Sequence, residues 1–336
     1  VHLVFTALVL LAACSAAVPP EVPKSEGPFE MLSLHTRYKM KISNDCSAGA
    51  ALVLKDGAMI YERYFGAVHR GPGASPVDSA SRFPFYSISK EFGVAVLFSL
   101  VSDSLLALDD PVCKYLDYFT GGKPYPREKV TLRQLASHTA GVTRPRDAAA
   151  SDPEFADVTL EFEPGTDFHY NELGMKILGR VMEKAGGKPY EDLLKERILQ
   201  PLGLTSVGYL RPGDDTTNVV HTFNGLDSSS VRYSPKPYPG SGLYGNMRDI
   251  AKMGQLWLDR GRSEGRQLFR EELVDEAWTN YNHFGHPHCD TEYGLMTWLS
   301  SPDRAAFMAG AAQTVGAILP DQKMIVLIGL NQFDGD

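Results

Sequence analysis

Hydrophobic residues follow two periodicities along this chain, and each periodicity occupies its own part of it. Runs with the pattern of β-strands lie near the two ends, at 50–54, 59–65, 293–299, 313–319 and 324–330. The first two are separated by Lys55-Asp56-Gly57-Ala58, and an Asp-Gly pair between two such runs predicts a hairpin. We therefore expect a sheet that is built from both ends of the chain.

The middle of the chain has helical periodicity. Helices are predicted at 91–100, 131–137, 172–185, 190–199 and 247–258. The first is apolar nearly all round and should be buried. Thr131 and Gln134 form a capping box, Gly186 closes the third helix, and Asn246 can cap the last.

This order of elements predicts an α+β fold within one domain over residues 28–336. The sheet lobe would comprise about 28–85 and 235–336, and a mainly helical lobe would be inserted at about 86–234. The last predicted strand, 324–330, is followed by only six residues. We expect one face of this strand to lack cover, as in a fragment of a longer protein, unless a helix from residues 28–43 covers it.

The first 27 residues have a different character. Residues 1–13 are almost wholly apolar, and Leu11-Ala12-Ala13-Cys14 matches a bacterial lipobox, in which the cysteine is lipidated after cleavage. The small residues 15–17 also suit an ordinary signal peptidase, and 19–27 has the composition of a tether. The run lacks a preceding Lys or Arg and begins at Val1, as a truncated start would. We expect an exported protein, periplasmic or anchored to the membrane through Cys14.

Composition narrows the class of protein. The chain is 43% hydrophobic and 22% charged, which is ordinary for a globular protein, and no internal stretch reaches the apolar length of a membrane span. Its net charge of −8 and the absence of Lys/Arg runs argue against nucleic-acid binding.

The cysteines and histidines do not suggest a metal centre. The three cysteines that remain beside Cys14 have no close spacing, which fits neither a disulfide framework nor a zinc site. His283, His286, His288 and Cys289 lie among Gly and Pro, without the i, i+4 spacing of a zinc enzyme. We therefore predict no metal and no cofactor.

The chemistry of the chain is concentrated at Ser87-Ile88-Ser89-Lys90, just before the buried helix. Ser87 and Lys90 are three residues apart and share one helix face. Burial would lower the pKa of Lys90, so that it could accept a proton and make Ser87 a nucleophile, with the first N–H groups of the helix placed for an oxyanion. The alternative is a solvated helix start with Ser87 as its cap.

Several further strings, in a fixed order, bear on this choice. They are Leu108-Asp109-Asp110-Pro111, the segment 130–141, the segment 164–170, Pro201-Leu202-Gly203-Leu204 and Gly240-Ser241-Gly242-Leu243-Tyr244. Together with the S-x-x-K motif, they resemble the serine β-lactamase and penicillin-binding-protein-like family, in particular its class C and esterase branch, from about residue 50 to 330. The resemblance implies an antiparallel sheet flanked by helices and hydrolysis through an acyl-enzyme.

The second motif of that family is Y-x-N, and Tyr170 stands at its tyrosine. A nearby lysine ammonium would favour the phenolate, which could then relay the proton of Ser87. Two residues on, however, Glu172 replaces the usual amide, and Asn171 is displaced by one position. Asn171 and Glu172 are thus candidates for substrate binding. Alternatively, Glu172 simply begins the following helix, where a negative charge is favourable.

The third motif of the family, K-T-G or H-T-G, corresponds here to Met308-Ala309-Gly310-Ala311. Gly310 retains the close backbone approach, and the N–H of Ala311 could be a second oxyanion donor beside that of Ser87. The missing cation would otherwise bind the carboxylate of a penicillin or a stem peptide. Its loss favours neutral esters or amides.

Three functions follow as hypotheses. The preferred one is a secreted serine hydrolase that cleaves a small ester, amide or peptide through an acyl-enzyme on Ser87, with Lys90 and Tyr170 moving the proton. The second is a β-lactamase or D-Ala-D-Ala carboxypeptidase. The third is a catalytically weak homologue that binds a cell-envelope ligand, supported by Glu172 and by the bare third motif.

Overall fold

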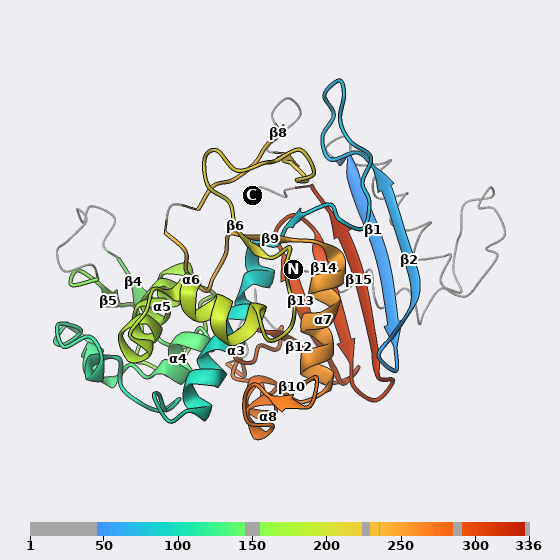
Figure 1. The fold of residues 1–336 in the computed structure, drawn as a ribbon. Helices are drawn as coiled ribbons and strands as arrows, with labels where there is room; N and C mark the ends of the chain where they lie inside the picture. Colours follow the sequence, from blue (N-terminus) through green and yellow to red (C-terminus); the bar gives the residue numbers. More distant parts are fainter. Residues whose placement is uncertain (1–45, 145–154, 224–228, 235, 285–290, 333–336) are drawn as a thin grey trace.

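The fold is built around a six-stranded antiparallel sheet that unites the two ends of the chain (Figure 1). The computed structural model describes residues 46–144, 155–223, 229–234, 236–284 and 291–332. The strand order is β12-β13-β14-β15-β1-β2. These strands are β1 (Ala48–Lys55), β2 (Ala58–Gly66), β12 (Trp298–Ser300), β13 (Ala305–Gly310), β14 (Thr314–Leu319) and β15 (Met324–Leu330). The predicted sheet of both termini is confirmed.

The strands of the main sheet agree with the sequence prediction except at two points. One is β13, which lies outside the runs that were predicted as strands. Asp56 and Gly57 turn the β1–β2 hairpin with φ of 52° and 78°, as an Asp-Gly turn requires. The predicted strand at 293–299 is wrong over most of its length, because β12 begins only at Trp298. Met296 has a φ of 62°, which turns the chain so that Tyr293 bridges back to Trp298.

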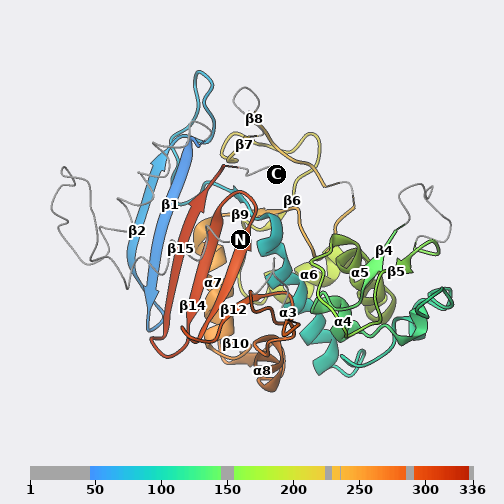
Figure 2. The same ribbon diagram turned by 180° about the vertical axis from the view of Figure 1, so that it is seen from behind.

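Helix α3 (Ser89–Ser102) is the central element of the molecule, and residues 89–101 are all buried. It lies between the sheet and a group of helices on its other side (Figures 1 and 2). That group comprises α4 (Leu132–Ala136), α5 (Glu172–Gly186) and α6 (Tyr190–Leu194), which continues as a π-helical turn to Leu199. The structure thus has the predicted α+β arrangement, with a mainly helical part inserted between the strands.

Local capping signals account for most helix ends. Thr131 and Gln134 form both hydrogen bonds of the predicted capping box of α4. Asn246 caps α7 (Met247–Leu258), as predicted. The end of α5 differs from the prediction, because Gly186 is its last residue and Gly187, with a φ of 68°, adopts the left-handed conformation that closes it.

Smaller elements connect these layers. They are β3 (Phe83–Pro84), β4 (Val142–Thr143), β5 (Thr159–Leu160), β6 (Gly208–Tyr209), β7 (Thr222–Phe223), β8 (Ser229–Ser230), β9 (Leu243–Gly245), β10 (Arg262–Ser263), β11 (Arg266–Gln267), α8 (Glu272–Ala277) and 3-10 turns at Tyr86–Ile88, Val112–Lys114 and Arg127–Lys129. The sheet β3-β9-β6 is the one that matters for the site, because β3 leads directly into Tyr86–Ile88.

Both faces of β15 are packed. Ile325 and Leu327 are fully buried in the main core, where Gly254 of α7 lies against Ile325. On the opposite face, Val326 is buried and Ile328 is half-buried in a second cluster. The described members of this second cluster all belong to the strands of the sheet, so the expectation about what covers this face stays a prediction. The residues 28–43 that were considered as a cover lie outside the described residues, as does the predicted leader with Cys14.

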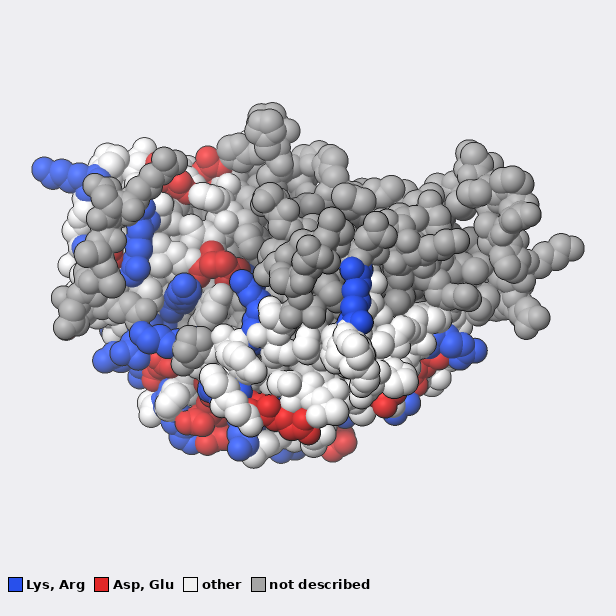
Figure 3. Space-filling view, turned by 90° about the horizontal axis from the view of Figure 1, so that it is seen from above, with Lys and Arg blue, Asp and Glu red and all other residues white. Residues whose placement is uncertain are grey.

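Two observations concern the exterior. Within the described parts of the chain, no helix combines the length and the apolar character needed to cross a bilayer. On the face shown in Figure 3, basic and acidic side chains are interspersed along the described rim.

Candidate active site

Ser87 lies in the 3-10 turn between β3 and α3, at the point where the sheet meets the central helix. Its Oγ is 2.9 Å from the hydroxyl of Tyr170 and 3.2 Å from Nζ of Lys90. Tyr86, just before it, has a φ of 45°, a strained value for a residue with a large side chain. The structure thus brings together the three side chains that the sequence singled out for catalysis. The rival Ser89 is buried, and its Oγ accepts from the N–H of Leu243.

Lys90 is 1% exposed, and each of its three donors has a partner. It donates to Ser87 Oγ, to Gly240 O at 2.9 Å and to Oε1 of Glu172, with which it forms an ion pair. Burial acts to lower the pKa of Lys90 and is the largest single effect. The charges and hydrogen bonds of Tyr170 and Glu172 outweigh it, so the pKa is raised. The prediction of a lowered lysine pKa is therefore wrong: Lys90 is a cation at neutral pH.

Tyr170 is held in place by aromatic neighbours. Its ring stacks on Trp298 with centroids 5.5 Å apart and an interplanar angle of 12°. The ring of His138 lies 4.4 Å away and Tyr293 meets it edge-on at 6.0 Å. Lys90 Nζ is 4.8 Å from the ring centroid, so a negative charge on the tyrosine would face a buried cation. This surrounding fixes the tyrosine hydroxyl on Ser87.

His138 is a neutral support for this arrangement. It is 3% exposed, and burial, with further contributions from Lys90 and His169, holds its pKa well below the usual range. Its Nδ1 accepts from the N–H of Asn171 at 3.1 Å, so the ring hydrogen of the neutral form is on Nε2. His138 lies within the segment 130–141 that carried the resemblance, yet the sequence analysis gave it no role.

Asn171 and Glu172 have separate positions. The Asn171 side chain accepts from Gly174 N–H as the cap of α5 and donates to Val142 O at 2.7 Å, so its amide is engaged within the protein. The prediction that Asn171 binds substrate does not agree with this placement. Glu172 begins α5 and also reaches the cleft, where Oε1 pairs with Lys90 and Oε2 accepts from Tyr238 at 3.0 Å. A carboxylate therefore faces the lysine of this site.

Gly310 ends β13 beside the turn that carries Ser87. A Cβ atom at this position would lie 2.4 Å from the carbonyl oxygen of Phe85, a distance that no side chain tolerates. The close backbone approach that was predicted for Gly310 is thus present. Ala311 follows directly, at the end of the strand and next to this contact. Its N–H and that of Ser87, at the start of a helical turn, remain the candidates for holding an oxyanion.

Three residues of the site were missed by sequence reasoning. Gly240 supplies a carbonyl to Lys90, Tyr238 donates to Glu172, and Trp298 stacks on Tyr170. The string 240–244 was noticed only as part of the resemblance. No local pattern indicates Trp298, because its contact depends on how β12 lies against the segment of Tyr170.

The histidine-rich segment 283–289 was considered as a metal site in the sequence analysis. Among the described residues, no group of three or more His, Cys, Asp and Glu side chains is arranged to hold an ion. His286, His288 and Cys289 of the histidine-rich segment lie outside the described residues.

Comparisons with known proteins agree with this geometry. The family model for β-lactamase matches residues 38–336. The D-alanyl-D-alanine-carboxypeptidase/endopeptidase AmpH of Escherichia coli is 28% identical over 271 residues, which are 76% of this chain and 69% of that protein. Penicillin-binding protein 4 of Amycolatopsis lactamdurans is 30% identical over 254 residues, covering 70% of this chain and 65% of that one.

Solved structures show the same fold. A class C β-lactamase superposes with a TM-score of 0.77 and 18% identity, over 91% of this chain and 92% of its own. EstCE1, a hydrolase with promiscuous acyltransferase activity, superposes with a TM-score of 0.75 and 18% identity, over 91% and 93%. Since the family match extends over nearly the whole chain, this protein belongs to the β-lactamase family of serine hydrolases.

Proposed function

We propose that this protein is an exported hydrolase that cleaves esters or unactivated amides through an acyl-enzyme on Ser87. The observation that carries the proposal is the position of Ser87 Oγ, 2.9 Å from Tyr170 and 3.2 Å from Lys90. A hydroxyl within hydrogen-bond reach of a base that is itself oriented by a third group is the arrangement of an activated nucleophile.

Tyr170 is the general base in this proposal, because the raised pKa of Lys90 keeps the lysine protonated. Ser87 Oγ attacks the carbonyl carbon while its proton passes to the oxygen of Tyr170 in its phenolate form, and the negative charge moves to the carbonyl oxygen. Tyr170 then gives this proton to the leaving alcohol or amine, and the acyl group stays on Ser87. In the second half of the reaction, water attacks the carbonyl carbon of the acyl-enzyme and gives a proton to Tyr170. Tyr170 then returns this proton to Ser87 Oγ as the acid is released.

Lys90 supports these steps as a fixed charge. Its ammonium stays within reach of Ser87 and over the Tyr170 ring, where it stabilises negative charge on either oxygen. Glu172 opposes this effect, because its carboxylate neutralises part of the lysine charge. The N–H groups of Ser87 and Ala311 would hold the oxyanion of the tetrahedral intermediate.

β-Lactamase or D-Ala-D-Ala carboxypeptidase activity is the second candidate. Similarity to AmpH, a D-alanyl-D-alanine-carboxypeptidase/endopeptidase, and to a class C β-lactamase favours it. Against it stands the segment Met308–Ala311, where the family's cation for a substrate carboxylate is absent. For this reason we propose esters and unactivated amides as the substrates, in preference to β-lactams and D-Ala-D-Ala peptides.

Covalent labelling tests the proposal. A fluorophosphonate probe should label the wild-type protein and Ser89→Ala, whereas Ser87→Ala should not be labelled. Ser89→Ala is the matched control, because it removes a neighbouring hydroxyl whose oxygen is already used by the Leu243 N–H. Labelling of Ser87→Ala, or none of the wild type, would refute the proposal. A fluorescent penicillin that labels Ser87 faster than any ester turns over would favour the second candidate.

Export is the part of the proposal that rests on residues 1–17 alone. Expression of the natural gene in a bacterial host, with labelled palmitate in the medium, should give a lipidated product, and Cys14→Ala should remove the label. A wild-type protein that stays unlabelled in the cytoplasm would contradict both export and lipidation.

A further inference from the structure

A short loop, residues 238–243, contacts both members of the ion pair between Lys90 and Glu172. The carbonyl of Gly240 accepts from Lys90 Nζ at 2.9 Å, and the hydroxyl of Tyr238 donates to Glu172 Oε2 at 3.0 Å. A single loop, distant from both charged residues in the sequence, therefore shapes the surroundings of the cation and of its carboxylate.

Pro239 fixes this loop between two helices. It is buried, and it lies against Gly93 of α3 and Gly179 of α5. A Cβ atom on Gly93 would lie 2.5 Å from Pro239 Cβ, and one on Gly179 would lie 2.7 Å from Pro239 Cδ. Both distances are too short for a normal contact, so the two glycines leave the space that the proline ring fills. The proline thereby fixes the backbone of the residues on either side of it.

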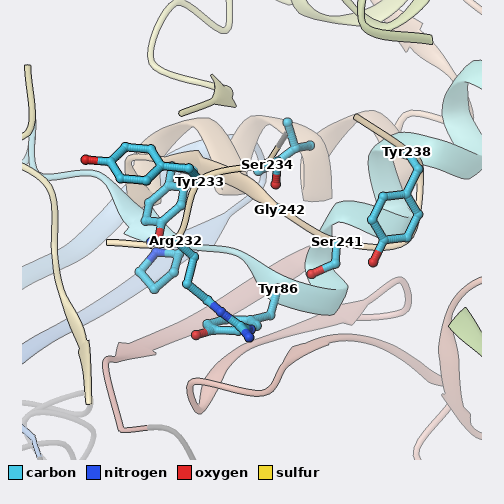
Figure 4. A pocket seen from close by; sticks show the side chains of 10 residues that line it. Tyr86, Arg232, Tyr233, Ser234, Tyr238, Ser241 and Gly242 are labelled. Atoms are coloured by element: carbon cyan, nitrogen blue, oxygen red, sulfur yellow. The ribbon is translucent and has the colours of Figure 1, made fainter. Parts of the chain in front are cut away.

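Hydrogen bonds hold the two ends of the loop. The carbonyl of Tyr238 accepts from the hydroxyl of Tyr209 on β6 at 2.7 Å, and the N–H of Leu243 donates to Ser89 Oγ at 3.2 Å. Tyr238 and Ser241 also form a β-bridge, and Figure 4 shows their side chains next to each other on this loop. The position of the Tyr238 hydroxyl is therefore set by the protein itself.

Glu172 is the member of the ion pair that needs such a contact. The side chain of Lys90 is 2% exposed, whereas that of Glu172 is 39% exposed and has several rotatable bonds. An ion pair with a partly exposed carboxylate is weak unless further contacts fix its geometry, because water competes for the carboxylate. The Tyr238 hydroxyl is such a contact, since it binds the carboxylate oxygen that Lys90 does not use.

Tyr238 also remains a donor in alkaline solution. Burial raises the pKa of Tyr238, and the charge and hydrogen bond of Glu172 raise it further, so the hydroxyl keeps its hydrogen. Other titratable groups surround the pair on α3, α4, α5 and the segment before α5. They are Glu91, the neutral His138, Tyr170 and Lys176, whose Nζ lies 5.6 Å from the centroid of the Tyr238 ring.

We propose that Tyr238 is a positioning residue of the hydrolysis: its hydroxyl, fixed by the loop 238–243, holds the Glu172 carboxylate on Lys90. This inference rests on the proposed reaction at Ser87, in which Lys90 acts as a cation. Without the hydroxyl, Glu172 turns toward solvent, and Lys90 loses the neighbouring negative charge that keeps it protonated at high pH. Tyr238 therefore extends the range of pH in which the site works, and it does so through Glu172.

Tyr238→Phe tests the inference, because it removes the hydroxyl and keeps the ring. The descending, alkaline limb of its pH–rate profile with p-nitrophenyl acetate should move to lower pH by about half a unit or more, and by less than in Glu172→Gln. Turnover at pH 7 should stay within about twofold of the wild type, because Lys90 is a cation there in each protein. A merely structural defect would instead lower turnover at every pH.

Two comparisons show whether the effect passes through Glu172. In a Glu172→Gln background, Tyr238→Phe should move the limb no further, because no carboxylate charge is left to position. Tyr233→Phe is the matched control, since Tyr233 is 44% exposed and Figure 4 shows it across the pocket from Tyr238; its profile should equal that of the wild type. An unmoved limb in Tyr238→Phe, or an equal further shift in the double variant, would overturn the inference.

A titration of Lys90 itself separates this inference from the proposed hydrolysis. In protein with carbon-13-labelled lysine, the Cε resonance of Lys90, assigned with Lys90→Arg, is followed by NMR from pH 7 to pH 11. Its response to pH should move to lower pH in Tyr238→Phe and stay in place in Tyr233→Phe. Identical titration curves in wild type and Tyr238→Phe would refute the positioning role, even if esters are cleaved. Absent fluorophosphonate labelling of Ser87 would refute the hydrolysis and leave the NMR result standing.

Discussion

Lys90 and Glu172, which are 82 residues apart in the chain, form an ion pair inside the cleft. The lysine side chain is 2% exposed and that of the glutamate is 39% exposed. The pair therefore joins a buried cation to a carboxylate that is still partly exposed to solvent. Glu172 occupies the position at which the family usually has a neutral amide. The negative charge on Glu172 therefore makes the electrostatics of this site different.

Replacing Glu172 should change both pH dependence and substrate range. In Glu172→Asn and Glu172→Gln, the loss of a negative charge should lower the pKa of Lys90, because the charge and the hydrogen bond of Glu172 raise it. Because the proposed mechanism uses Lys90 as a cation, the descending, alkaline limb of the pH–rate profile for ester hydrolysis should move to lower pH. If Glu172 is what disfavours β-lactams, nitrocefin turnover should rise in Glu172→Asn while ester turnover changes little.

The two replacements distinguish charge from shape, since Gln keeps the length of Glu and Asn restores the family's residue. A profile that stays in place in both variants would show that Glu172 does not set the charge state of Lys90. Unchanged nitrocefin turnover would show that the missing cation at β13, and not Glu172, determines the substrate class.

Lys90 and Tyr170 should act as one unit. Lys90→Ala and Tyr170→Phe should each lower kcat by about 10² to 10⁴, the range for a lost acid–base group. The double variant should lose far less than the product of the two, because the lysine acts on the tyrosine that it faces. Steady-state rates of the four proteins measure this coupling. Losses that multiply would mean that the two residues work independently.

Gly310→Ala should inactivate the enzyme through its backbone. The new methyl group would meet the Phe85 carbonyl, so β13 must move away from the turn of Ser87 and carry Ala311 with it. We expect a fall in kcat of about 10² or more with KM less affected. Gly208→Ala is the control, because a Cβ there meets nothing within 4 Å, and its activity should be near that of the wild type. An active Gly310→Ala enzyme would exclude this end of β13 from the oxyanion site.

Glu91 should make the stability of the protein depend on pH. Its side chain is 2% exposed, and burial raises its pKa to about 8. Because the folded state binds the proton more tightly than the unfolded state, its stabilising effect is complete below about pH 4.3 and is lost as pH rises through 8.

Glu91→Gln removes this titration. The free energy of unfolding of the wild type should fall relative to that of the variant by about 3 to 5 kcal/mol between pH 5 and pH 9. Urea unfolding at pH 5, 7 and 9 measures the difference, in which the other titrating groups cancel. A constant difference across these pH values would show that Glu91 is charged throughout.

Features that depend on neighbouring residues were predicted from the sequence. The Asp56-Gly57 hairpin, the capping box of Thr131 and Gln134 and the cap at Asn246 all formed as expected. Each rests on hydrogen bonds or backbone angles within a few residues, which no distant part of the chain needs to supply. The spacing of Ser87 and Lys90 is of the same kind, because one helical turn places both side chains on one face.

The charge state of the site was decided by tertiary structure. The sequence places Lys90 at the start of a buried helix, and a lowered pKa was predicted from that burial. The fold brings Glu172 and Tyr170, some 80 positions away in the chain, next to the lysine, and their charges and hydrogen bonds raise its pKa instead. Asn171 and Glu172 are adjacent in sequence, yet only the path of α5 turns one into a cap and the other toward the lysine. Electrostatic interactions depend on distance and burial, and both are properties of the folded chain. For the same reason the contact between the Arg232 guanidinium and the Tyr86 ring, which joins residues far apart in the sequence, is visible only in three dimensions.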